Sequence, residues 1–157
     1  MQKESLTAQA IEQFKGGLFC SEAILQVFNE ELNLGLNDAA IRMATGFGAG
    51  LGASKCSCGS ITGAVLVLSA LKGRTKKEES VDEVFALTQE LHDEFKKRYK
   101  ATCCRVLTRP VKWGEPEHHQ YCEQFVGGAV EILVDILERG NKEKELGEPG
   151  SIYRSRS

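Results

Sequence analysis

Six cysteines are the residues of this chain best suited to chemistry. They lie at positions 20, 56, 58, 103, 104 and 122 of 157 residues. The start of the chain lacks a signal-peptide pattern, so we expect a cytoplasmic protein whose thiols stay reduced. There, cysteines more often bind metal or do redox chemistry than form structural disulfides. No Cys-x-x-Cys spacing occurs, which argues against the usual zinc-ribbon, thioredoxin and c-type haem sites.

Most of these cysteines fall where predicted helices begin. Cys20 lies in the first turn of an amphipathic helix predicted over about 20–33, and Cys58 lies where a buried helix over 59–71 starts. Cys122 lies in the second turn of the last predicted helix. A helix N-terminus offers free N–H groups and partial positive charge, which favour the thiolate. If these ends converge, they form a pocket suited to an anionic cofactor held by sulfur.

A glycine-rich loop precedes the buried helix. Four glycines occur within the seven residues 46–52. Backbone without side chains can approach a bulky group closely, and its N–H groups can donate to that group. We therefore predict Gly48, Gly50, Gly52 and Gly59 as cofactor-binding residues. The alternative is a flexible loop or close helix packing.

The elements that must position these residues are helical. Apolar spacing of about 3.6 residues predicts one all-α domain of five to seven helices over residues 1–140, followed by a polar tail over 141–157. The β-branched residues of 59–71 leave a strand as the alternative there. A capping box at Ser80 and Glu83 predicts the start of a long helix that ends near residue 100. The last helix is predicted from Pro116 to about Arg139, and shorter helices over about 6–15, 37–44 and 101–107.

Charge and hydropathy exclude several classes of protein. Lysine and arginine number 20 against 22 acidic residues, so there is no basic excess for nucleic-acid binding. The longest apolar run, residues 61–71, is too short to span a bilayer, so we expect no membrane insertion. No Ser-His-Asp or paired-carboxylate arrangement stands out, and no catalytic residue is assigned. His118 and His119 precede Cys122, and we expect them to be solvated rather than metal ligands.

The order of cysteines and glycines resembles that of a bacterial and archaeal family of proteins described as redox-active. The family pattern has one cysteine, a Cys-Gly-Ala-x-x-Gly element and two further cysteines. Residues 58–63, Cys-Gly-Ser-Ile-Thr-Gly, resemble the central element, with serine in place of the usual alanine. Cys20 is similar to the first cysteine, and Cys104 and Cys122 are similar to the last two. The resemblance spans about residues 5–138.

This resemblance implies an iron–sulfur cluster on Cys20, Cys58, Cys104 and Cys122 in an α-helical domain. A related cluster-binding domain occurs in split-Soret cytochromes. Cys56 and Cys103 are extra cysteines, which we keep as alternate ligands. The resemblance does not decide between a 2Fe–2S and a 4Fe–4S cluster. It also does not identify the redox partner protein or decide whether the protein forms a homodimer.

Two other functions are compatible with the same residues. One is a metal-free thiol–disulfide oxidoreductase with a reactive thiolate at Cys58, its candidate pairs being Cys56/Cys58 and Cys103/Cys104. The other is a helical module with structural zinc on the same cysteines. We favour the iron–sulfur protein, acting in electron transfer or redox sensing.

Overall fold

A computed structural model describes the backbone of residues 1–146 and the side chains of residues 1–142. Within this range the fold is all-α, as predicted, and the region 59–71 is a helix rather than a strand. The right-handed helices are α1 Lys3–Lys15, α2 Cys20–Glu31, α3 Asp38–Arg42, α5 Gly59–Lys72, α6 Asp82–Tyr99, α7 Cys104–Leu107 and α8 Pro116–Leu146. A 3-10 turn, η1 Thr45–Phe47, and a short turn, α4 Gly48–Leu51, connect α3 to α5.

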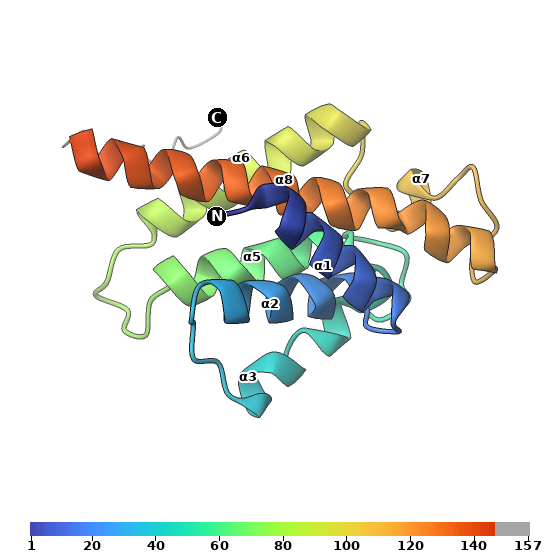
Figure 1. The fold of residues 1–157 in the computed structure, drawn as a ribbon, viewed down its shortest axis with the longest axis horizontal. Helices are drawn as coiled ribbons and strands as arrows, with labels where there is room; N and C mark the ends of the chain where they lie inside the picture. The colour runs from blue at the N-terminus through green and yellow to red at the C-terminus, as the bar shows by residue number, and fades with distance from the viewer. Residues whose placement is uncertain (147–157) are drawn as a thin grey trace.

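Helix α5 is the central element of the bundle (Figure 1). It packs against α2, α6 and α8, and α8 also packs against α1 and α6. The core lies where these helices meet and contains large, fully buried side chains such as Phe28, Leu68, Phe95 and Leu133. None of the helices described is both long and apolar enough to cross a membrane.

The crossing of α2 and α5 depends on a glycine. A Cβ added at Gly63 would lie 2.7 Å from the Cα and 2.8 Å from the carbonyl oxygen of Ser21. Ser21 is itself fully buried, and its hydroxyl donates to the carbonyl of Ala44 at 2.8 Å. The two backbones are therefore nearly in contact where both helices begin, which brings Cys20 close to the start of α5.

The predicted capping box of the long helix is wrong. Helix α6 begins at Asp82, and Val81 occupies the N-cap position. The Ser80 hydroxyl accepts from the Asp82 N–H at 3.1 Å instead of capping a later turn. Glu83 forms an ion pair with Lys72 at 2.7 Å, which draws its carboxylate toward α5.

The predicted end of the last helix near Arg139 is also wrong. Helix α8 continues through Gly140 to Leu146. The residues beyond 139 are mainly Lys and Glu, which are good helix formers even without an apolar face. The remainder of the predicted tail, residues 147–157, lies outside the described residues.

Candidate functional site

Cys58 and Cys104 are brought together by a short antiparallel pairing of two loops. Ser57 and Cys103 form an isolated β-bridge. On either side of it the Cys58 N–H donates to the Thr102 carbonyl at 2.9 Å, and the Cys104 N–H donates to the Cys56 carbonyl at 2.6 Å. The bridge fixes Cys58 just before α5 and Cys104 in the first turn of α7. The two thiols lie within hydrogen-bonding distance of each other.

Cys20 is the first residue of α2, and the carboxylate of Glu22 holds this end of the helix. Glu22 accepts from the Phe19 N–H at 2.8 Å and from the Thr45 hydroxyl at 2.6 Å. These bonds satisfy a free N–H group at the helix start and attach the glycine-rich segment to it. As a result, the Cys20 thiol and residues 45–53 lie on the same side of the molecule.

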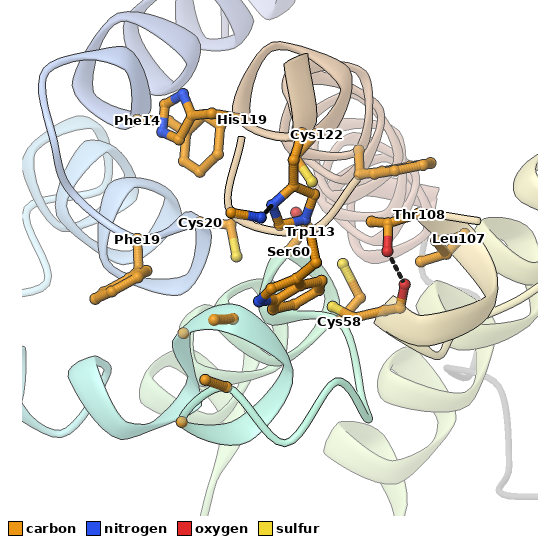
Figure 2. Close-up of a pocket in the computed structure, with 18 of the residues that line it drawn as sticks. Phe14, Phe19, Cys20, Cys58, Ser60, Leu107, Thr108, Trp113, His119 and Cys122 are labelled. Carbon is orange, nitrogen blue, oxygen red and sulfur yellow. Dashed lines mark hydrogen bonds between the residues drawn. The ribbon is translucent and has the colours of Figure 1, made fainter. Parts of the chain in front are cut away.

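One cavity collects the cysteines of the predicted ligand set. It has a volume of about 410 Å³ and is lined by Cys20, Cys58, Cys104 and Cys122. Figure 2 shows the labelled sulfur atoms of Cys20, Cys58 and Cys122 pointing into a shared space. The rest of its wall is mainly apolar and aromatic, with Phe14, Phe19, Trp113 and Phe125 among the contributors. Such a wall excludes water from the thiols and lowers the local dielectric constant.

The two extra cysteines do not line this cavity. Cys56 is exposed. Cys103 occupies the bridge position opposite Ser57, and its thiol donates to the Lys55 carbonyl at 3.2 Å. Because successive side chains of an extended segment alternate in direction, the Cys103 side chain points away from the side on which Cys104 lies.

The glycine-rich segment forms a left-handed turn against the cavity. Five consecutive residues have positive φ: Ala49 (52°), Gly50 (68°), Leu51 (62°), Gly52 (56°) and Ala53 (67°). Each non-glycine residue in this conformation costs about 1–2 kcal/mol. The turn directs the Ala49 N–H to the sulfur of Cys20. Strained backbone of this kind is found mainly at functional sites.

The predicted glycines fall into two groups. Gly48 and Gly52 line the cavity. Gly50 and Gly59 are behind the thiols: a Cβ at Gly50 would lie 3.0 Å from the Cys104 sulfur, and one at Gly59 would collide with the Cys20 sulfur. The second pair therefore makes room for cysteine side chains rather than for a ligand.

The Cys58 thiol has the most strongly stabilised negative charge. Hydrogen bonding by the Cys104 thiol lowers its pKa most, and the Ser60 N–H, the Ser60 hydroxyl and the Ile61 N–H act in the same direction. Cys58 occupies the N-cap position of α5, so the partial positive charge at the start of this helix also favours its thiolate. Together these donors lower the pKa of Cys58 to about 7, against the opposing effect of burial.

The other three thiols are held in the neutral form. Burial raises the pKa of Cys20 to about 12 and that of Cys122 to about 12, and the charge of Cys58 adds to both effects. The hydrogen bond to Cys58 raises the pKa of Cys104, and its burial acts in the same direction. In the protein without a bound group, Cys58 is therefore the first of the four thiols to ionise as the pH rises, while Cys104 beside it keeps its proton.

We predict that Cys58 of the metal-free protein is alkylated by iodoacetamide with a midpoint near pH 7. Its thiolate fraction rises as the pH rises through 7, whereas an ordinary thiol needs about pH 8.5. Ser60→Ala removes one donor, so the pKa of Cys58 increases and alkylation at pH 7 slows. Rates at Cys58 measured by mass spectrometry between pH 5 and 10 check this.

Thr62→Ala is the matched control for that experiment. The Thr62 hydroxyl lies in the same helical turn but donates to the carbonyls of Cys58 and Gly59, not to the thiolate. The midpoint should therefore stay near pH 7 in this variant. An identical midpoint in wild type and Ser60→Ala would contradict the assignment of the Ser60 hydroxyl as a donor.

Both histidines of the sequence His118-His119 line the cavity. His119 is exposed and stacks on Phe14, with ring centroids 4.0 Å apart. His118 is half-buried and its Nε2 is completely buried, so the prediction that this residue is solvated is wrong. Only its position one helical turn before Cys122 could have indicated this from the sequence.

The four thiols surround the cavity instead of gathering at one point. Among the residues with described side chains, no group of three or more His, Cys, Asp or Glu is arranged to hold a metal ion. Any group bound by all four cysteines must therefore be large enough to reach the cavity walls, or the walls must move toward it.

The fold and this site define an all-α protein with a cavity lined by four cysteines. Residues 18–136 match the model of the family described as "Putative redox-active protein (C_GCAxxG_C_C)", and the chain belongs to this family. Neither a curated protein nor a solved structure matches the chain.

Proposed function

We propose that this protein is a redox protein that binds an iron–sulfur cluster through Cys20, Cys58, Cys104 and Cys122. The observation that carries the proposal is the single cavity, of about 410 Å³, lined by these four thiols from α2, the start of α5, α7 and α8. Thiolates are the usual ligands of such clusters, which carry one electron at a time. The protein would act in electron transfer or redox sensing.

The chemistry of the donors fits an anionic group. The Ala49 N–H points to the Cys20 sulfur, and N–H groups of Ser60 and Ile61 point to the Cys58 sulfur. Once the thiols are deprotonated, these donors stabilise the charge of the ligands in a cavity with few other polar groups. Gly50 and Gly59 supply the space that the sulfur atoms occupy.

The spread of the thiols favours a cluster over the zinc alternative. A structural zinc needs four ligands at about 2.0–2.3 Å from one point, and no described group of three or more ligands is arranged for a single ion. In a four-iron cluster each cysteine binds a different iron. Ligands distributed around a cavity suit that arrangement better than they suit one ion.

The spectrum of protein purified without oxygen tests this proposal. We expect broad visible absorption that bleaches when dithionite is added and returns on reoxidation. A colourless protein that gains no absorption after incubation with iron and sulfide would contradict it.

The contact between Cys58 and Cys104 favours one second candidate, a metal-free thiol–disulfide oxidoreductase. The Cys58 thiolate attacks a disulfide of an oxidised partner, one partner sulfur leaves, and a mixed disulfide forms. Cys104, after losing its proton, attacks the Cys58 sulfur. This closes a Cys58–Cys104 disulfide and releases the partner as a dithiol, so two electrons pass to the partner. The pair differs from the Cys56/Cys58 and Cys103/Cys104 pairs considered from the sequence.

We predict that glutathione disulfide converts the metal-free protein to a form with one internal disulfide, Cys58–Cys104. The lowered pKa of Cys58 makes it the attacking thiol, and Cys104 is the nearest resolving thiol. Peptide mapping identifies the linkage. In Cys104→Ser the reaction should stop at a glutathione adduct on Cys58, while Cys103→Ser should behave as wild type. A disulfide to Cys56 or Cys103 in the wild-type protein would exclude this pair.

A further inference from the structure

A ring N–H in the cavity wall has no hydrogen-bond partner. His118 lies in the first turn of α8, and its Nδ1 accepts from the Gly114 N–H at 3.2 Å. A neutral imidazole carries one proton, so this bond places the proton on Nε2. Nε2 is completely buried and unpartnered. A buried donor in this state is costly, which indicates that an acceptor belongs beside it.

The surroundings of His118 fix both its orientation and its charge. Its ring lies 4.3 Å from the ring of Trp113, and the Nζ of Lys55 lies 4.8 Å from the centre of the Trp113 ring. Burial lowers the pKa of His118, and His119 and Lys55 lower it further. The ring is therefore neutral at pH 7 and holds a single N–H donor in place.

His118 belongs to the same part of the cavity wall as one of the proposed ligands. His118 and Cys122 are one turn apart on α8 and line the same cavity. Two other buried side-chain atoms of the described residues lack partners, on Thr7 and Gln13, but neither residue lines the cavity. Of these three unpartnered atoms, only the His118 nitrogen belongs to a residue that lines the cavity with the four thiols.

We propose that the Nε2–H of His118 donates a hydrogen bond to a sulfur of the group bound by the four cysteines and raises its reduction potential. This inference rests on the proposed function. A hydrogen bond to sulfur stabilises added negative charge, so it favours the reduced state over the oxidised state. His118 is a positioning and tuning residue in this account, not a ligand.

Redox titration of the loaded protein tests the proposal. His118→Phe keeps an aromatic ring against Trp113 but removes the donor, and His118→Gln keeps an N–H donor. We expect the midpoint potential to fall in His118→Phe and to stay near the wild-type value in His118→Gln, with iron content unchanged in both. His92→Phe, on α6 and bonded to Asp93, is the control and should not shift the potential.

The outcomes separate the role of His118 from the proposed cluster binding on which it rests. Equal potentials in wild type and His118→Phe overturn the role of His118 and leave the cluster intact. A wild-type protein without iron overturns the proposed function and this inference together. If His118→Phe loses iron, His118→Leu takes its place in the titration. Loss of iron in both variants, with normal iron content in His118→Gln, supports the proposed hydrogen bond from His118. Loss of iron in all three variants overturns it.

Discussion

We expect Cys58→Ser and Cys104→Ser each to yield protein that is folded but has lost nearly all its iron and visible absorption. Both cysteines line the cavity and their thiols lie close together, so each substitution would remove one of the proposed ligands. A serine hydroxyl is a far poorer ligand for iron than a thiolate. Iron analysis and visible spectra of protein purified without oxygen measure the loss, and circular dichroism checks the fold.

The neighbouring cysteines supply matched controls for this experiment. Cys56 lies two residues from Cys58, and Cys103 is next to Cys104, but neither Cys56 nor Cys103 lines the cavity. Cys56→Ser and Cys103→Ser should therefore keep wild-type iron content. Loss of iron in Cys103→Ser with normal iron content in Cys104→Ser would mean that Cys103 binds the iron in place of Cys104. That result would contradict the site described here.

We expect Gly63→Ala to lower the free energy of unfolding by about 2–3 kcal/mol, which is at the upper end of the cost of overpacking a core. The added Cβ would lie 2.7 Å from the Cα of Ser21, and this contact is with backbone that cannot rotate away. Helices α2 and α5 must separate, which also moves Cys20 from Cys58. Thermal unfolding of the metal-free protein should show a melting temperature lower by roughly 5–10 °C.

Gly140→Ala is the control for the glycine experiment. Gly140 lies near the C-terminal end of α8, and among the described residues no atom lies within 4 Å of a Cβ added there. Alanine there should raise stability by about 0.5–1 kcal/mol, because it restricts the unfolded chain and favours the helix. A melting temperature for Gly63→Ala equal to that of wild type would mean that α2 and α5 are not in close contact.

Much of the helical fold could be predicted because it depends on local patterns. The apolar residues of α8 recur with helical spacing and are buried, namely Phe125, Val126, Ala129, Ile132, Leu133 and Ile136. Gly16 ends the first helix, and the Asn37 side chain caps α3 by accepting from the Ala40 N–H at 3.0 Å. Cys20, Cys58 and Cys122 could be placed near helix starts for the same reason.

The parts that the sequence did not reveal depend on contacts between distant residues or on strain. The Ser57–Cys103 bridge joins segments 46 residues apart, and this pairing decides which of Cys103 and Cys104 enters the cavity. Ala49, Leu51 and Ala53 have left-handed backbone, which their residue types disfavour. The orientation of His118 depends on a hydrogen bond from the Gly114 N–H, and the residue types around Gly114 do not specify the conformation of that turn.

Iron and acid-labile sulfide, measured per chain in protein purified without oxygen, test the central claim most directly. We expect iron and sulfide in equal amounts, at two or four atoms of each per chain, and their joint loss in Cys58→Ser. Iron-free protein with six titratable thiols, unchanged after reconstitution with iron and sulfide, would contradict the claim that the four-cysteine cavity binds a cluster.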